Sequence, residues 1–260
     1  MTLIAKSITA HMGKKQVLKG IDLAAEPGKV TAIVGPNGSG KSTLLKAISG
    51  ETKHAGTLSL NGRAVEDYAT WELASLRGVL QQSVFVAFPF TVIELVGLGQ
   101  ASGLSAADPT VAMKALTKVG LQGFENRNYH DLSGGEQQRV QLARVLAQVW
   151  QYGVDDDPRW LFLDEPVSSL DIGHQFVVMD IMQEFAHNGG GVVCVMHDLN
   201  LTAMIADQVV LLKSGQVLKS GSVEDVLTDG VLIEAYDCYI RVNTTPPSHS
   251  TFVLPQSVRH

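Results

Sequence analysis

The chain has 260 residues, 45% of them hydrophobic, which is enough to bury a core in one large domain or two small ones. Its net charge of −6 argues against a general nucleic-acid-binding surface, so we expect no nucleic acid as a partner. Two distant cysteines, Cys194 and Cys238, lack metal-ligand spacing, and no apolar run reaches the roughly 18 residues that span a bilayer. We expect a globular chain that is soluble or attached to a membrane through partners.

The first third of the chain is predicted to be rich in β-strands. Short runs with strand character, bounded by Gly, Pro or Asn, occupy residues 3–9, 17–25, 29–35 and 57–61. The third run is apolar and leads directly into a glycine-rich loop, which a helix-forming stretch at residues 43–48 follows. The sequence therefore predicts a strand, a loop and a helix in that order.

The glycine-rich loop matches the phosphate-binding pattern G-x-x-x-x-G-K-[ST] in full. It consists of Gly35, Pro36, Asn37, Gly38, Ser39, Gly40, Lys41, Ser42 and Thr43. Glycines here let backbone N–H groups close around phosphates, and the following helix turns its positive end toward them. We expect Lys41 to meet the β- and γ-phosphates of a nucleotide and the Ser42 hydroxyl to meet Mg²⁺. The weaker alternative is a turn that merely joins a strand to a helix.

Residues 83–133 differ in character and are predicted to form a small inserted helical subdomain. Thr91 and Glu94 stand at the spacing of a capping box that opens a first helix. An Asp-Pro pair then precedes a second helix predicted at residues 110–119. The segment 83–90 is too apolar for a free surface loop, so it either meets a partner or packs inside the subdomain.

Residues 132–139 read Leu-Ser-Gly-Gly-Glu-Gln-Gln-Arg and predict the start of a helix. Ser133 and Glu136 form the capping box of that helix, which is expected to run to about residue 150. Glycine costs about 0.5–1 kcal/mol relative to alanine in a helix, so helix formation alone explains Gly134 and Gly135 poorly. We therefore expect a phosphate to approach the backbone at these two positions.

From here on, helices alternate with apolar strands, which predicts a parallel sheet with helices on both faces. The strands are expected at residues 159–164 and 191–196 and the intervening helix at 172–187. A further helix, a hairpin around residues 214–215 and small helices should follow. The last stretch, from residue 244, is rich in Pro and Ser and is expected to pack loosely.

The first of these strands ends in two adjacent carboxylates, Asp164 and Glu165. Neighbouring side chains in a strand point to opposite faces, so the two should have different roles. In a chain with a phosphate-binding loop we expect Asp164 to hold Mg²⁺ and Glu165 to polarise the attacking water. The alternative is a solvated acidic pair that merely ends the strand.

The segment 132–139 looks like the signature of ATP-binding cassette (ABC) proteins, and the surrounding motifs resemble that family in order and spacing from about residue 3 to 240. The resemblance implies an α/β P-loop NTPase cassette with a mostly parallel core sheet, an antiparallel β subdomain and an inserted helical subdomain. It also implies two cassettes paired head to tail, with ATP between one P-loop and the opposite signature. The single domain 1–260 would divide into a core (1–82 and 134–240), the helical subdomain (83–133) and a C-terminal extension (241–260).

Several further residues take roles only through this resemblance. Gln82 resembles the family's Q-loop glutamine, which touches Mg²⁺ and the attacking water, although Gln81 is the alternative one residue away. Asp171 resembles the D-loop aspartate at the dimer interface and also fits a helix N-cap. His197 resembles the switch histidine at the γ-phosphate. Met12 stands where the family usually stacks an aromatic ring on adenine.

Details of the sequence resemble ATPase subunits of iron-chelate, haem and cobalamin importers, and are closest to haemin importers. This implies a homodimer bound peripherally to two transmembrane permease subunits on the cytoplasmic face of a bacterial inner membrane. A periplasmic substrate-binding protein would act indirectly, and the chain itself would bind no haem. Import of a ferric siderophore or cobalamin, a soluble ABC ATPase, and a regulatory module without turnover are the competing hypotheses.

Overall fold

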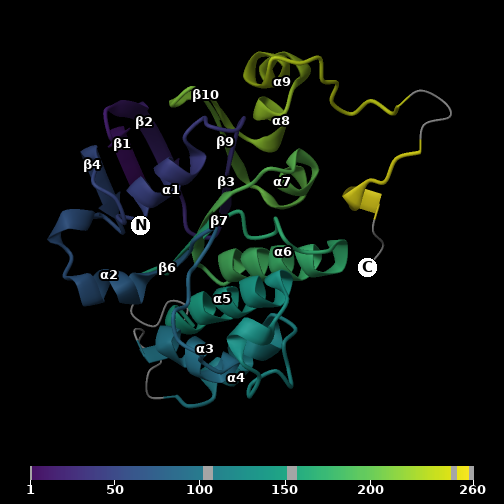
Figure 1. Cartoon of the computed structure of the whole chain (residues 1–260). Coiled ribbons are helices and arrows are strands. Elements are labelled where there is room, and N and C mark those ends of the chain that lie inside the picture. Colours follow the sequence, from purple (N-terminus) through teal and green to yellow (C-terminus); the bar gives the residue numbers. More distant parts are fainter. Residues whose placement is uncertain (1, 102–107, 151–156, 247–250, 258–260) are drawn as a thin grey trace.

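The computed structural model describes residues 2–101, 108–150, 157–246 and 251–257. Two sheets dominate it (Figure 1). The smaller is antiparallel, with strand order β2-β1-β4-β5. Its strands are β1 (Leu3–Met12), β2 (Lys15–Ala25), β4 (Ala55–Leu60) and β5 (Arg63–Ala64). The β-rich first third is therefore confirmed, and its first two strands extend beyond the predicted ranges.

The larger sheet has six strands in the order β10-β9-β3-β8-β7-β6. All neighbours are parallel except the hairpin of β9 and β10. The strands are β3 (Val30–Val34), β6 (Arg77–Leu80), β7 (Trp160–Asp164), β8 (Gly191–Val195), β9 (Gln208–Lys213) and β10 (Gln216–Gly221). The mostly parallel sheet expected from the alternation of helices and apolar strands is thus present.

Helices cover this sheet and form a group of their own below it (Figure 1). They are α1 (Lys41–Ile48), α2 (Thr70–Leu76), α3 (Val92–Ala101), α4 (Val111–Lys118), α5 (Gly134–Gln148), α6 (Ile172–His187), α7 (Leu199–Ile205), α8 (Val223–Val226) and α9 (Asp229–Tyr236). Short 3-10 turns occupy Val65–Asp67, Tyr129–Asp131 and Pro255–Ser257. Among the described residues, no helix is long and apolar enough to cross a membrane.

The central strands bury side chains on both faces and so divide the interior into two cores. In β7, Leu161 and Leu163 face the core shared with α5 and α6, while Trp160 and Phe162 face the core shared with α1 and the antiparallel sheet. This is the period-2 alternation of a strand whose two faces are both covered. The continuous apolar runs in the sequence follow from that position.

α5 lies between the helical group and the sheet, packing against α3 and α4 on one side and β6 on the other. Arg139, which is buried on α5, donates hydrogen bonds from its guanidinium to the carbonyls of Val119 and Gly120. These carbonyls end α4, so the arginine caps that helix from a neighbouring one. The boundary between helical subdomain and core at residues 133 and 134 remains a prediction, with α5 in contact with both parts.

The described part of the C-terminal extension returns toward α7 (Figure 1). There the side-chain amide of Gln256 donates a hydrogen bond to the carbonyl oxygen of Asn200, at 3.3 Å. Phe252 and Leu254 remain partly exposed beside it. The loose packing expected for the stretch from residue 244 remains a prediction.

Candidate active site

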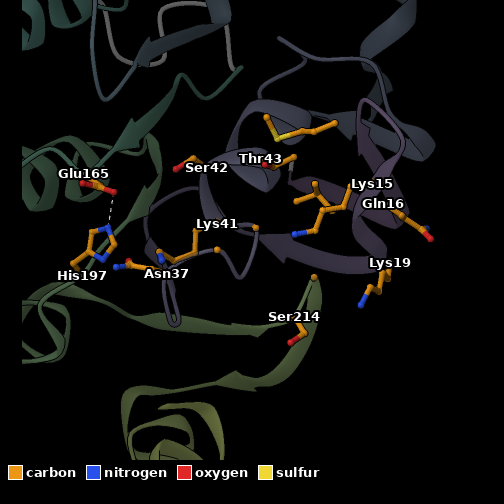
Figure 2. Close-up of a pocket in the computed structure, with 15 residues that line it drawn as sticks. Lys15, Gln16, Lys19, Asn37, Lys41, Ser42, Thr43, Glu165, His197 and Ser214 are labelled. Atoms are coloured by element: carbon orange, nitrogen blue, oxygen red, sulfur yellow. Dashed lines mark hydrogen bonds and ion pairs between the residues drawn. The ribbon is translucent and has the colours of Figure 1, made fainter. Parts of the chain in front are cut away.

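A cavity of about 570 Å³ opens at the carboxyl end of β3 (Figure 2). Its floor is the loop after β3, and one wall carries the side chains at the ends of β7 and β8. The end of β1, the first half of β2 and the turn of the β9–β10 hairpin supply the rest of the lining. In an open parallel sheet, ligands bind beyond the carboxyl ends of the strands, so this is the expected place for a nucleotide.

The loop after β3 can keep its shape only because of its glycines. Gly35 has a φ of +142°, and a Cβ there would stand 2.2 Å from the carbonyl oxygen of Leu212. Gly40 is the N-cap of α1 with a φ of +105° and no side chain to cap the helix. The first turn of α1 therefore lacks the side-chain acceptor that usually closes a helix N-terminus, which suits a phosphate as the acceptor.

Lys41 folds back over this loop. Its Nζ donates hydrogen bonds to the carbonyl oxygens of Gly35, at 2.8 Å, and Pro36, at 3.1 Å. Burial lowers the pKa of the lysine, while the carboxylates of Glu165 and Asp164 act in the opposite direction. An ammonium group held only by neutral carbonyl groups can exchange them for the stronger charged acceptors of a phosphate.

Ser42 and Asp164 meet at the base of the cavity. The Ser42 hydroxyl donates a 2.9 Å hydrogen bond to Oδ1 of Asp164, and Asp164 is only 2% exposed. Burial raises the pKa of Asp164, the hydrogen bond from Ser42 lowers it, and the neighbouring Glu165 raises it. A buried carboxylate beside a hydroxyl offers the hard oxygen ligands that Mg²⁺ prefers.

These two ligands fit a magnesium ion that is shared with a nucleotide. No group of three or more His, Cys, Asp or Glu side chains able to hold a metal occurs among the described residues. Mg²⁺ is commonly held by one or two protein oxygen ligands together with substrate phosphates and water, rather than by a full protein cage. The oxygen donors of Ser42 and Asp164 therefore fit a metal site that substrate phosphates and water would complete.

Glu165 and His197 lie side by side on one wall of the cavity, with their side chains pointing toward each other (Figure 2). Nε2 of His197 lies 2.5 Å from Oε1 of Glu165, and the glutamate side chain is 13% exposed against 41% for the histidine. Glu165 has a φ of +53°, in the left-handed region that costs a non-glycine residue free energy. Such strain in a cavity wall is typical of residues placed for chemistry.

The wall opposite this pair has no ring for a base to stack on. Met12 is 66% exposed there, and Lys15, Gln16 and Val17 stand beside it. None of the described residues that line the cavity is Phe, Tyr or Trp. At Met12, where the family usually has an aromatic ring, this wall therefore consists of a thioether and of aliphatic or polar side chains, and its contact with a base remains a prediction.

Neither Q-loop candidate lines the cavity in this structure. The side-chain amide of Gln81 donates a 2.8 Å hydrogen bond to Oε1 of Glu51, just beyond the end of α1. Gln82 is exposed. Since Gln81 is engaged with Glu51, Gln82 is the better placed of the two for a ligand, but its role stays a prediction.

The predicted signature residues start α5 as expected, and they too lie outside the cavity. The Ser133 backbone and hydroxyl each donate a 2.7 Å hydrogen bond to Oε2 of Glu136. These bonds from Ser133 lower the pKa of Glu136. A Cβ at Gly134 would meet nothing within 4 Å, whereas one at Gly135 would lie 3.2 Å from the carbonyl oxygen of Ser169. Packing within the chain therefore gives no reason for glycine at position 134.

Asp171 caps α6. Its Oδ1 accepts the backbone N–H of His174 at 2.9 Å and lies 2.8 Å from the Nδ1 of the same histidine. The backbone hydrogen bond from His174 is the main reason that the pKa of Asp171 is lowered. The N-cap role is confirmed, and the role at a dimer interface remains a prediction.

Some residues of the site were not anticipated from the sequence. Lys15, Gln16, Lys19, Ser214 and Gly215 line the cavity because the turn of the β9–β10 hairpin packs on β2. The backbone N–H of Lys19 donates to the carbonyl oxygen of Gly215, at 2.9 Å. A turn was predicted at this point of the chain, but only the sheet order brings it to the phosphate-binding loop.

Comparison with known proteins agrees with this arrangement. The family model described as ABC transporter matches residues 18–168. The chain is 57% identical to the hemin import ATP-binding protein HmuV of Ruegeria sp. (strain TM1040), covering 100% of both chains. It is 56% identical to the protein of that name from Jannaschia sp. (strain CCS1), covering 99% of this chain and 95% of the relative. With the one from Rhizobium meliloti (strain 1021) it shares 53%, over 97% and 98% of the two chains.

Solved structures show the same fold. A dimeric bacterial ABC transporter cassette is 28% identical, with a TM-score of 0.72, and the match covers 85% of this chain and 98% of that one. An ABC transporter cassette in its ADP conformation is 24% identical with a TM-score of 0.75, over 91% and 99% of the two chains. The expected α/β cassette fold, with its antiparallel subdomain, is thereby confirmed.

Proposed function

Because the chain belongs to the ABC transporter family, we propose that it is the ATP-hydrolysing subunit of an importer that carries haemin across a membrane. The Glu165–His197 pair, which faces the phosphate-binding loop across one cavity, carries the enzymatic part of this proposal. The identity of the substrate, haemin, is inferred from the relatives. They are named hemin import ATP-binding proteins, and their similarity to this chain extends over nearly their whole length.

In the proposed reaction, water attacks the γ-phosphate of ATP. Glu165 accepts a proton from that water, since its carboxylate is aimed into the cavity and held by His197. Lys41 exchanges the carbonyl oxygens of Gly35 and Pro36 for phosphate oxygens. Ser42 and Asp164 would hold Mg²⁺, which when bound supplies positive charge that stabilises the phosphates.

A second copy of the chain is proposed to complete each ATP site. The start of α5 at Ser133 and Gly134 is exposed and lies outside the cavity of its own chain, so it is free to face another. A homodimer with head-to-tail contacts would place this helix start over the partner's P-loop, with Asp171 at the same interface. Backbone N–H groups at the start of α5 would then bind the γ-phosphate from the far side.

Two transmembrane permease subunits are the proposed membrane partners. Phe85 is 92% exposed and Phe88 is 68% exposed, on the segment that joins β6 to α3. Large exposed aromatic side chains at neighbouring positions suit a protein contact better than free solvent. The chain would then lie peripherally on the cytoplasmic face of the inner membrane, with a periplasmic substrate-binding protein reached only through the permease and no contact with haem.

The experiment is ATP hydrolysis by the chain assembled with its permease in lipid. We expect a haemin-loaded binding protein to stimulate hydrolysis, and replacement of Phe85 and Phe88 by Asp to remove the stimulation while leaving the ATPase of the isolated chain unchanged. Stimulation by a siderophore- or cobalamin-loaded binding protein, with none by the haemin-loaded one, would show that the importer carries a siderophore or cobalamin instead of haemin. A rate of ATP hydrolysis that is the same with and without the permease would instead favour a soluble ABC ATPase.

A further inference from the structure

The backbone at Glu165 is held in its strained conformation from several directions. Its N–H donates a 3.2 Å hydrogen bond to the carbonyl oxygen of Val195 in β8. Its own carbonyl oxygen accepts from the Ser168 hydroxyl at 3.1 Å and from the side-chain amide of Gln138 at 3.0 Å. With φ at +53°, the peptide depends on such contacts to stay in place.

Among these donors to and acceptors from Glu165, Gln138 is the one that lies on helix α5. Gln138 lies in the second turn of that helix, and its Nε2 reaches across to the residue that follows β7. Its Oε1 is buried and has no hydrogen-bond partner within the part of the chain that the structure describes. A buried acceptor without a hydrogen bond lowers the stability of the fold, so stability alone does not explain why glutamine occupies position 138.

The same helix begins with the residues that we propose to face the partner's nucleotide. Ser133 is the N-cap of α5, and Gln138 follows within the next two turns. A helix moves as a rigid element, so a displacement of its first turn also displaces the Gln138 side chain. The structure therefore contains a direct physical link between one chain's signature and the same chain's Glu165.

We propose that Gln138 is a positioning residue for hydrolysis. By holding the carbonyl of Glu165, it sets the direction of the Glu165 carboxylate according to the position of α5. Docking of the partner's ATP at Ser133 and Gly134 would then align Glu165 for the other ATP of the dimer. The inference rests on the proposed function, because it presumes hydrolysis at a site shared by two copies.

The test is the substitution Gln138→Met, which keeps the side-chain length and removes the donor. The matched control is Gln148→Met on the same helix, because Gln148 also donates to backbone carbonyls, those of Ala74 at 2.7 Å and Arg77 at 3.0 Å, and lies far along α5 from Glu165. We expect Gln138→Met to lower kcat about 10- to 100-fold with KM for ATP within about twofold, since misplaced catalytic groups cost this much. Gln148→Met should leave kcat within about twofold.

A second measurement separates positioning from assembly. In a Glu165→Gln background, Gln138→Met should still form the ATP-dependent dimer, and the thermal midpoint of Gln138→Met should match that of the control. Gln138→Glu, which keeps the shape and when ionised has no donor, should lose kcat as well. Wild-type kcat in Gln138→Met, or loss of the dimer, would overturn the inference. A wild-type chain without ATPase activity would instead contradict the proposed function.

Discussion

Gly134→Ala separates folding from function at the proposed partner-facing surface. Gly134 opens α5 and is exposed, and a Cβ built there meets nothing within 4 Å. Alanine favours helix over glycine by about 0.5–1 kcal/mol, so the isolated chain should become slightly more stable. For a chain of this size the thermal midpoint should rise by about 1–4 °C. The added methyl group would nevertheless occupy the space that the partner's phosphate needs.

The control for this variant is Gly230→Ala. Gly230 also lies in the first turn of a helix, α9, with nothing within 4 Å of its built Cβ. Both variants should show the same small gain in differential scanning fluorimetry, whereas only Gly134→Ala should lose ATP hydrolysis, by about 100-fold. If Gly134→Ala hydrolyses ATP at the wild-type rate, no phosphate approaches this helix start and the shared site is wrong.

Three further predictions concern other residues of the structure. Met12→Tyr should lower KM for ATP about two- to thirteenfold, because a ring on the wall at Met12 adds about 0.5–1.5 kcal/mol of stacking, and steady-state kinetics with ATP will measure it. Gly35→Ala should lower the thermal midpoint by several degrees and abolish binding of a fluorescent nucleotide, since its Cβ would stand 2.2 Å from the carbonyl oxygen of Leu212. Cys238 is exposed, whereas burial raises the pKa of the Cys194 thiol to about 12, so an alkylating reagent should modify Cys238 at neutral pH and reach Cys194 only on unfolding, as mass spectrometry would show.

The features that local chemistry determines were predictable from the sequence. The capping boxes at Thr91 with Glu94 and at Ser133 with Glu136 both form, because each requires only residues three apart. Ser42 and Asp164 were both expected at one metal site, and their side chains do meet, because the helix after β3 starts at the same edge of the sheet at which β7, two strands away, ends.

Features that depend on the order of strands and on side-chain reach were not predictable in this way. The hairpin turn enters the cavity wall because β9 lies beside β3, and a Cβ at Gly215 would stand 2.1 Å from the carbonyl oxygen of Val17. The bond from Gln138 to Glu165 spans 27 positions in the sequence and depends on where α5 packs against the sheet. No local pattern specifies either contact.

The loop after β6 shows a third kind of difference. The family resemblance predicts Gln82, or Gln81 beside it, at the nucleotide, yet in this structure Gln82 lies outside the cavity and Gln81 is bound to Glu51. A family motif predicts contacts in the complex with nucleotide and a second copy, whereas the structure of one chain shows only the contacts within that chain. The predicted role of Gln82 therefore has to be tested with both nucleotide and a second copy of the chain present.

Each ATP site should be completed by a second copy of the chain. Light scattering with size-exclusion chromatography on Glu165→Gln, with and without Mg-ATP, tests it most directly. We expect a monomer without nucleotide, a doubled mass with Mg-ATP, and two bound ATP per dimer that are not hydrolysed. A monomer at saturating Mg-ATP, or turnover by Glu165→Gln at the wild-type rate, would contradict it.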